Sequence, residues 1–487
     1  MRIVLVHPAG SNWVPGQTDF TPIANRMAPL GLLSMAAWLE QRGHRVRIYD
    51  CLGWDRLPPR KRVVQDVLKW RPDLVGFSAT TSGFLDGYAL AQAIKEQRSD
   101  IRTVFGGVHV SAIGAPLLKH FAAIDYLCPG EGEETLAELA EGRRPADIPG
   151  LIWRDNGRVE ANPARQLLPD LDHLPFPAYH LLAGFPKRYH LPLFSYIQRP
   201  GATMVTSRGC PYRCSYCDRS VFKQGYRYNS AAYIYAHLHY LRDRFGIRHV
   251  NIYDDLFTMH RNRISELCTL LARRPLGLQF NCAVRVGHAD DDLLRMLRAA
   301  GCLQVSVGIE TGDADLMERH KPGVRLAGVK DTVRRIQRHG LRVKGLFMMG
   351  LPGETEASIR RTSDLVLSLG LDDMNMSKFT PFHGAPVWRN LEAHGTLHED
   401  WRRMNCLNFV FVPHAIGSRE TLDELYNQHV KRFYSDPAWR RKFRRRLWEH
   451  RWSLWHVMVH LPGFIAAKRQ FEPQKDTDGC RLPKTPC

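Results

Sequence analysis

Residues 207–218 read SRGCPYRCSYCD and set three cysteines, Cys210, Cys214 and Cys217, within eight positions directly after a predicted strand. Cysteines this close together rarely serve packing alone. Thiolates are soft ligands that suit iron–sulfur clusters or zinc. Structural metal sites normally use four protein ligands, so a local set of three leaves one coordination position open for a small chelating molecule. The alternatives to a cluster are a zinc knuckle with a distant fourth ligand and three buried thiols.

The segment that contains this motif, residues 201–400, alternates apolar strands with helical patterns. The predicted strands are ATMVT (202–206), RHVNIYD (248–254), LQFNCAVR (278–285), LQVSVGIE (303–310), RVKGLFMMG (342–350) and MNMSKF (374–379). A closed eightfold barrel would need more chain, so we predict a partial (β/α)6 barrel of the TIM type. In such barrels the chemistry lies at the carboxyl ends of the strands.

The N-terminal residues 1–145 also alternate strand and helix patterns. The predicted strands are RIVLVHP (2–8), HRVRIYD (44–50), DLVGFSAT (73–80), RTVFGG (102–107) and IDYLCPG (124–130). This alternation predicts an α/β domain with a parallel, doubly wound, Rossmann-like sheet. Such sheets bind ligands at the carboxyl ends of their strands.

The other two segments differ in character. Residues 146–200 contain eight prolines and no regular period, which indicates a linker packed on the surface between the domains. Residues 401–487 are basic and predicted to be mostly helical. The expected order is therefore an N-terminal domain (1–145), a proline-rich linker (146–200), a partial barrel (201–400) and a helical C-terminal region (401–487).

The 487 residues carry a formal net charge of +19, which suits either an anionic partner or a solvated basic surface. The eleven cysteines are odd in number and mostly scattered singly, and the chain opens on a strand pattern rather than a signal peptide. No apolar stretch approaches the roughly 20 residues of a membrane span. We therefore predict a reducing, cytoplasmic location, with a peripheral position on the inner face of the membrane left open.

The three-cysteine spacing, its place after a first barrel strand and Tyr216 before the last cysteine together resemble the radical S-adenosylmethionine superfamily. The resemblance implies a [4Fe–4S] cluster on Cys210, Cys214 and Cys217. It also implies that the open iron chelates the amino and carboxylate groups of S-adenosylmethionine. One electron from the cluster would then break the S–C5′ bond and release a 5′-deoxyadenosyl radical.

Further strand ends match the positions that bind S-adenosylmethionine in that superfamily. Carboxylates there would contact its amino group and ribose, Arg285 would pair with its carboxylate, and a glycine-rich strand end would approach adenine. The residues that the resemblance assigns to this cofactor are Tyr216, Asp254, Asp255, Arg285, Glu310, Gly350, Pro352 and Gly353. Each carboxylate could instead cap the helix that follows it. No residue is predicted as catalytic in its own right.

Residues 1–140, ahead of an LPFP-containing linker and the cluster barrel, resemble the cobalamin-binding domain of many radical enzymes. The residues that the resemblance assigns to cobalamin are Ser78, Thr80, Thr81, Gly106, Gly107, His109, Gly130 and Glu131. The D-x-H-x-x-G motif, whose histidine ligates cobalt, is absent before residue 140. Cobalt would then lack that ligand, and a Rossmann-like domain without ligand, or with another nucleotide, is the alternative.

The C-terminal stretch 440–460 combines seven lysines or arginines with tryptophans at helical spacing. Trp448, Trp452, Trp455 and Val459 are predicted to share one face. We favour packing of that face on the barrel, with solvated arginines, over contact with an anionic membrane surface, and membrane contact over nucleic acid. His383 is expected at the end of the sixth barrel strand, facing the substrate zone, in a structural role.

These resemblances imply a cobalamin-dependent radical enzyme that functionalises an unactivated carbon of a small-molecule or lipid-like substrate. C-methylation in natural-product, lipid or tetrapyrrole metabolism is the leading hypothesis. The alternative within this architecture resembles the anaerobic Mg-protoporphyrin monomethyl ester oxidative cyclase. An RNA methylthiotransferase would need three more cysteines ahead of the barrel, and a non-catalytic cobalamin sensor would not need an open iron. An electron donor such as flavodoxin or ferredoxin is an expected partner.

Overall fold

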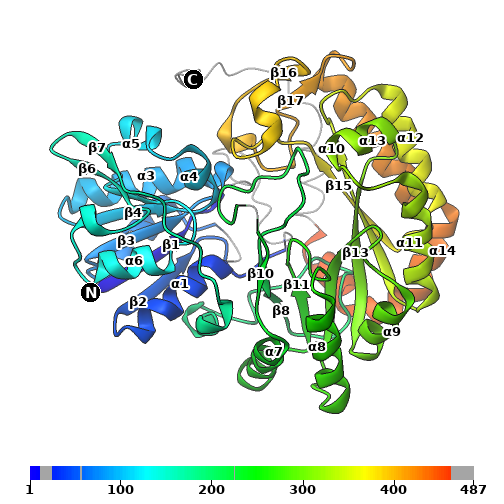
Figure 1. Cartoon of the computed structure of the whole chain (residues 1–487), viewed down its shortest axis with the longest axis horizontal. Coiled ribbons are helices and arrows are strands. Elements are labelled where there is room, and N and C mark those ends of the chain that lie inside the picture. The colour runs from blue at the N-terminus through cyan, green and yellow to red at the C-terminus, as the bar shows by residue number, and fades with distance from the viewer. Residues whose placement is uncertain (11–24, 55–56, 224, 462–487) are drawn as a thin grey trace.

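A computed structural model describes residues 1–10, 25–54, 57–223 and 225–461. Two separate sheets stand side by side, each with helices packed on it (Figure 1). The N-terminal sheet has seven strands in the order β2-β1-β3-β4-β5-β6-β7, and the barrel sheet has six in the order β15-β14-β13-β12-β11-β8. No helix within the described ranges has both the length and the apolar character that crossing a bilayer requires.

The N-terminal sheet is parallel through β5, and β6 and β7 add antiparallel strands at one edge. Its strands are β1 (Arg2–His7), β2 (Arg45–Asp50), β3 (Leu74–Ser78), β4 (Arg102–Gly106), β5 (Tyr126–Cys128), β6 (Ile152–Asp155) and β7 (Arg158–Ala161). Its helices are α1 (Leu30–Gln41), α2 (Arg60–Lys69), α3 (Thr81–Gln97), α4 (Val108–Ile113), α5 (Pro116–His120) and α6 (Glu133–Ala140). Because helices cover both faces, the central strands are apolar along their whole length.

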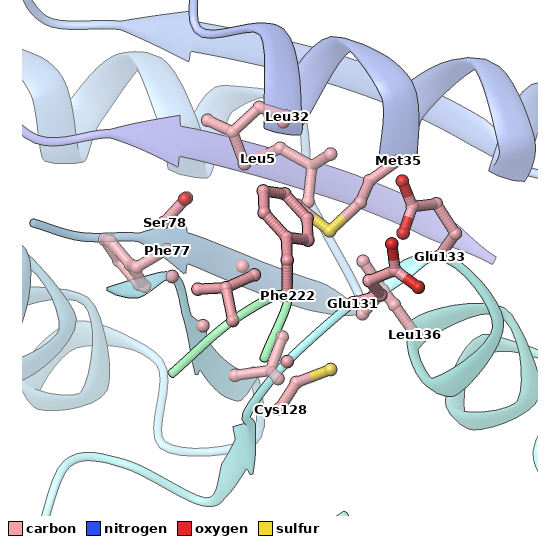
Figure 2. A pocket seen from close by; sticks show the side chains of 18 of the residues that line it. Leu5, Leu32, Met35, Phe77, Ser78, Cys128, Glu131, Glu133, Leu136 and Phe222 are labelled. Atoms are coloured by element: carbon pink, nitrogen blue, oxygen red, sulfur yellow. The ribbon is translucent and has the colours of Figure 1, made fainter. Parts of the chain in front are cut away.

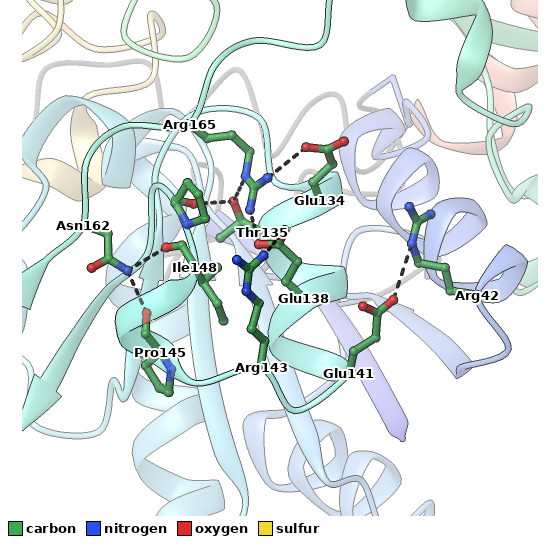
Figure 3. A network of polar contacts seen from close by, with 11 residues as sticks. Arg42, Glu134, Thr135, Glu138, Glu141, Arg143, Pro145, Ile148, Asn162 and Arg165 are labelled. Carbon is green, nitrogen blue, oxygen red and sulfur yellow. Dashed lines mark hydrogen bonds and ion pairs between the residues drawn. The ribbon is translucent and has the colours of Figure 1, made fainter.

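Part of the segment predicted as a linker belongs to this first sheet. β6 and β7 lie within residues 146–200, and side chains bind the chain around them to α6 (Figure 3). Arg165 donates to Thr135 and pairs with Glu134 and Glu138, while Asn162 donates to two backbone carbonyls. We therefore propose 161 rather than 145 as the end of the N-terminal unit, because strand pairing outweighs the proline-rich composition.

The barrel sheet is entirely parallel and curls around its own interior. Its strands are β8 (Gly201–Met204), β11 (His249–Ile252), β12 (Gln279–Arg285), β13 (Cys302–Glu310), β14 (Arg342–Met349) and β15 (Asp373–Lys378). The helices outside it are α7 (Ala231–Phe245), α8 (Arg261–Arg273), α9 (Asp291–Ala299), α10 (Ala314–His320), α11 (Leu326–Arg338) and α12 (Glu356–Ser368). Several helices begin at a capping side chain, as Asp290 shows by accepting from the Leu293 amide at 2.8 Å.

The C-terminal region packs back on both units. It contains the antiparallel pair β16 (Gly395–Leu397) and β17 (Phe411–Pro413), then α13 (Arg419–Ser435), α14 (Pro437–Arg446) and α15 (Arg451–Val459). Short 3-10 turns, η6 (Trp401–Arg403) and η7 (Leu447–His450), interrupt it. Trp401, Met404 and Val410 are buried in the core of the N-terminal unit, so this region ties that unit to the barrel.

The predicted fold class is confirmed. Every strand predicted for the two sheets is present, and the six barrel strands form an open half-barrel rather than a closed one. The sequence patterns did not reveal the hairpin β6–β7, the pair β16–β17, or a two-residue pairing of β9 (Ser207–Arg208) with β10 (Arg227–Tyr228). All three pairings are short and join segments that carry little periodicity.

Candidate functional site

The three cysteines lie in a loop closed at its base by strand pairing. β9 and β10 flank residues 209–226 and pair Ser207 with Tyr228 and Arg208 with Arg227. Gly209 has φ +86°, and a Cβ there would collide with the Gly225 carbonyl. The loop therefore leaves the barrel sheet just beyond β8, at the carboxyl ends of the strands, as predicted for a reactive site.

The thiols of this loop are free and partly exposed. Burial raises the pKa of Cys217 to about 12, and the neighbouring Asp255, Cys214 and Cys210 act in the same direction. No set of three His, Cys, Asp or Glu side chains in the described ranges is arranged to hold a metal ion. The cluster assignment therefore rests on the chemistry of the donors: three soft thiols in one short loop suit an iron–sulfur cluster that keeps one iron open.

Arg285, predicted to meet the carboxylate of S-adenosylmethionine, lies beside the cluster loop at the end of β12. Its guanidinium stacks on Tyr212 at 3.8 Å and donates to the Pro322 carbonyl at 2.7 Å. The second nitrogen lies 3.9 Å from the Cys214 sulfur. Arg285 thus brings a fixed positive charge to the edge of the loop where an anionic group would bind.

Glu310 ends β13 in a conformation that non-glycine residues avoid. Its φ is +69°, and the strand register shifts between Gly308 and Glu310. Its carboxylate pairs with Lys321 at 2.7 Å, and the Tyr216 hydroxyl also faces it. Strained backbone of this kind persists where surrounding contacts enforce it, often at functional sites. The bulge therefore turns Glu310 toward Tyr216 and the cluster loop.

The two adjacent aspartates at the end of β11 have different surroundings. Asp254 is buried and accepts from the Thr206 amide and hydroxyl, both at 2.5 Å, and from the Ser207 amide at 3.2 Å. Arg263 stands 3.6 Å from it. Asp255 lines a cavity. Partial desolvation there, together with the negative charge of Asp254, raises the pKa of Asp255. We therefore remove Asp254 from the predicted cofactor contacts and keep Asp255 as a proposal.

The glycine-rich end of β14 is held open by a buried carboxyl group. Gly350 and Gly353 have φ of +92° and +83°, where a Cβ would be strained. Glu354 accepts from the amides of Gly350 and Leu351. His320, which sequence patterns did not single out, donates to the Pro352 carbonyl at 2.8 Å and lies 2.7 Å from the Ser215 hydroxyl. His320 thereby fixes the predicted adenine-binding turn to the cluster loop.

The buried Glu354 makes stability depend on pH. Burial raises its pKa to about 8 against an ordinary value of 4.5. Because the folded state holds this proton more tightly than the unfolded state, stability is full below about pH 4.5 and declines as pH rises through about 8. We expect urea unfolding of the wild type to lose about 3 kcal/mol between about pH 5 and 8, and Glu354→Gln to lose much less. Glu356→Gln, on an exposed pair with Arg360, is the control. Parallel pH profiles for E354Q and the wild type would contradict this expectation.

A cavity opens at the carboxyl edge of the N-terminal sheet (Figure 2). Its volume is about 700 Å³, including space open to solvent. Five of the eight residues predicted to bind cobalamin line it: Ser78, Gly106, Gly107, Gly130 and Glu131. A Cβ on Gly31 would meet no atom within 4 Å, so this wall leaves room for a bulky ligand. Leu5, Met35 and Phe222 are among the apolar side chains that line it (Figure 2). Phe222 comes from the cluster loop, which therefore forms one wall of the cavity.

The other three predicted cobalamin residues lie outside this cavity. Thr80 is exposed, and Thr81 is buried with its hydroxyl 3.2 Å from His109. His109 packs on Trp401 and Phe84, and burial lowers its pKa to about 3. His383 lies against it and pairs with Glu399, so His383 faces the N-terminal unit rather than the predicted substrate zone. We withdraw Thr80, Thr81 and His109 as direct contacts.

A buried ion network joins the cobalamin-site loop to the cluster loop. Glu131 pairs with Arg208 at 2.8 Å and Arg227 at 2.9 Å, and Arg208 also pairs with Glu133 at 2.6 Å. Burial alone would raise the pKa of Glu133, but Arg208 outweighs it and holds that pKa below its usual value. Both arginines sit on the β9–β10 pair. The Glu131 carboxylate therefore joins the N-terminal unit to the β9–β10 pair through ion pairs.

We expect Glu131→Gln to lower the free energy of unfolding by about 3 kcal/mol, because two largely buried guanidinium groups lose their shared anion. Glu134→Gln is the matched control, since Glu134 forms a half-exposed pair with Arg165 and should cost about 1 kcal/mol or less. Urea unfolding followed by circular dichroism measures both. Equal losses for the two variants would show that the network does not hold the units together.

A second cavity, of about 810 Å³ including space open to solvent, adjoins the first. Its lining comes from α1, the proline-rich segment, β9, α7 and the end of β11, where Tyr253 and Asp255 face it. Gly31, Arg208 and Phe222 line both cavities. The two cavities therefore share a wall formed by α1, β9 and the cluster loop, which no sequence pattern indicated.

Comparison with known proteins agrees with this geometry. The Radical SAM superfamily matches residues 204–366, and the B12 binding domain matches residues 17–140. An uncharacterized methyltransferase of Pyrococcus horikoshii is 28% identical over 90% of this chain and 93% of its own. An anaerobic magnesium-protoporphyrin IX monomethyl ester cyclase of Rubrivivax gelatinosus is 26% identical over 90% and 78%.

Among solved structures, the radical S-adenosylmethionine methyltransferase TsrM from Kitasatospora setae, with cobalamin and a [4Fe–4S] cluster bound, superimposes with a TM-score of 0.67. It is 20% identical and covers 90% of this chain and 89% of its own, so it shares the fold. The two matched families lie in the order that the two sheets show. The chain is a radical S-adenosylmethionine enzyme with a B12-binding domain, and its cofactors are a [4Fe–4S] cluster, S-adenosylmethionine and cobalamin.

Proposed function

We propose that this enzyme methylates an unactivated carbon of a small apolar or lipid-like substrate. The observation that carries the proposal is the wall of Gly31, Arg208 and Phe222 that the two neighbouring cavities share. When bound, the cluster with S-adenosylmethionine supplies a carbon radical, and cobalamin supplies a methyl group. A substrate in the second cavity would lie between the source of the radical and the source of the methyl group.

The residues of this chain have distinct roles in the proposal. Cys210, Cys214 and Cys217 would hold the cluster, with Arg285 and Asp255 offering opposite charges to the carboxylate and the amino group of S-adenosylmethionine. Glu310 and Tyr216 would receive its ribose and adenine, and the Gly350–Gly353 turn would approach the adenine edge. Ser78, Gly106, Gly107 and Gly130 would shape the cobalamin cavity.

The second cavity suggests the substrate class. Its lining is mostly apolar and aromatic, with Leu171, Pro175, Tyr233 and His237 among the contributors. Burial lowers the pKa of His237 to about 3, so this ring is neutral and adds no charge. The surface suits an apolar molecule that buries most of its area. We propose that an apolar natural product, tetrapyrrole or lipid binds here.

Oxidative cyclisation remains the second candidate, because the cyclase of Rubrivivax gelatinosus aligns with nearly the whole chain. Isotopes separate the two outcomes. The protein would be reconstituted anaerobically with iron, sulfide and cobalamin, and supplied with a reducing flavodoxin or ferredoxin and with S-adenosylmethionine labelled in its methyl group. Methylation carries the label into the product, whereas cyclisation leaves the product unlabelled and takes oxygen from labelled water.

A further inference from the structure

The last described stretch of the chain exposes an unusual amount of apolar surface. The structure exposes eleven large apolar side chains among the described residues, and five of them belong to this stretch: Trp448 (79%), Trp455 (59%), Met458 (73%), Val459 (51%) and Leu461 (48%). They extend from η7 through α15 to Leu461, just beyond the end of that helix. We call residues 440–461 the C-terminal ridge. Apolar side chains gathered in this way mark an interaction site when polar groups surround them.

Arginines surround this apolar surface. Arg440, Arg441, Arg444, Arg445 and Arg451 are exposed, and none forms an ion pair with any part of the chain that the structure describes. Lys442 and Arg446, by contrast, both pair with Asp372. Trp448 lies in η7, between Arg444 of α14 and Arg451 of α15, so both arginines are close to it along the chain. The ridge therefore offers unpaired positive charge beside apolar side chains.

The opposite side of the ridge anchors it to the barrel. Arg199 lies over the Trp452 ring at 3.6 Å, Ser453 accepts from the Phe194 amide at 3.2 Å, and Arg342 donates to His450 at 2.8 Å. The prediction that the tryptophans share one packed face is wrong, because Trp452 packs while Trp448 and Trp455 face outward. Arg342 begins β14, so the ridge lies at the amino ends of the barrel strands, opposite the cluster loop.

We propose that the C-terminal ridge binds an anionic membrane surface. A bilayer interface accepts tryptophan and aliphatic side chains at the acyl boundary while its acidic headgroups meet arginine. Single-stranded nucleic acid would stack on rings, but Met458, Val459 and Leu461 have none to offer. The net charge of +19 favours approach to the same surface. Surface binding would retain the enzyme at the bilayer without covering its cavities.

The test uses the full-length protein, reconstituted anaerobically with its cluster and cobalamin, in sedimentation with vesicles. We expect binding to vesicles of phosphatidylcholine with phosphatidylglycerol, weak binding to phosphatidylcholine alone, and loss of binding at high salt. Trp455→Ser combined with Met458→Ser should lower binding by about tenfold or more. Arg444→Glu combined with Arg445→Glu should have a similar effect.

Matched controls alter residues outside the ridge. Met259→Ser with Leu407→Ser removes two other exposed apolar side chains, and Lys330→Glu with Arg334→Glu makes the same charge change on α11. Neither should change vesicle binding. Circular dichroism and 5′-deoxyadenosine release in the absence of vesicles should stay at wild-type values in all four variants.

Three outcomes would overturn the proposal. Equal binding to neutral and anionic vesicles would remove the role of the arginines, and unchanged binding by the ridge variants would remove the role of this surface. Self-association or RNA binding that the ridge variants abolish, in a protein that does not sediment with vesicles, would assign the surface to a second copy or to nucleic acid.

Discussion

Replacing Cys214 by alanine is expected to abolish S-adenosylmethionine cleavage. Three local thiols are the proposed protein ligands of the cluster, and the loop offers no spare cysteine to replace one. We expect 5′-deoxyadenosine release to fall by about a thousandfold or more, equivalent to at least about 4 kcal/mol of transition-state free energy. Iron content and the cluster absorbance should fall with it, while cobalamin binding should be largely retained, because most residues that line its cavity belong to the N-terminal unit.

Cys268→Ala is the matched control, because Cys268 is a buried thiol in α8 that takes no part in the loop. It should keep cluster, cobalamin and activity, with a modest loss of stability from the small cavity. A C214A variant with full iron content and turnover would refute the assignment of the cluster. A variant that loses the cluster but keeps the biological function would indicate a cobalamin sensor instead of an enzyme.

Substitution of the two neighbouring aspartates should affect different properties: stability for Asp254 and S-adenosylmethionine binding for Asp255. Asp254→Asn is expected to lower the free energy of unfolding by about 3 kcal/mol, because it breaks a fully buried pair with Arg263 and weakens the hold on Thr206 and Ser207. Those residues lead directly into the cluster loop, so cluster retention should also fall. Urea unfolding and iron content after desalting measure the two effects.

Asp255→Asn removes an equal charge one position along and serves as the comparison. Asp255 faces the second cavity, so its loss should leave stability within about 0.5 kcal/mol of the wild type and weaken S-adenosylmethionine binding instead. Binding of S-adenosylmethionine to the reconstituted protein, followed by calorimetry, reports that effect. If D254N bound S-adenosylmethionine poorly at wild-type stability and D255N bound it normally, the roles of the two would be reversed.

Residue pattern alone predicted much of this molecule. Apolar runs of five to nine residues, separated by amphipathic helices, were enough to place both sheets, because such strands are buried on both faces and need no distant partner to be recognised. The cluster motif could also be recognised from the sequence, since its three cysteines are close together in the chain. The Rossmann-like and half-barrel folds, the two matched families and the cofactors follow from these local signals.

Only the tertiary structure could show that Asp254 and Asp255 have different surroundings. It also showed that His109 lies outside the cavity that Gly106 and Gly107 line. Asp254 is buried while the adjacent Asp255 lines a cavity, and His109 is buried in α4 against Trp401, so contacts with distant segments decide which side chain is exposed. The structure also showed that Glu131 bonds to Arg208 and Arg227, which lie 77 and 96 residues away. Likewise, it showed that Trp452 packs against Arg199 whereas Trp448 and Trp455 are exposed.

The sequence by itself therefore determined the elements, their order and the cluster ligands, because local hydrophobic periodicity and ligand spacing encode them. The tertiary structure decided which polar groups form hydrogen bonds and ion pairs that hold the units together, and which polar groups line the cavities. That distinction depends on partners far away in the chain. Their contacts assign Asp254, Glu131 and His109 to the framework, and leave Asp255, Glu310 and Arg285 around the site where the chemistry is proposed.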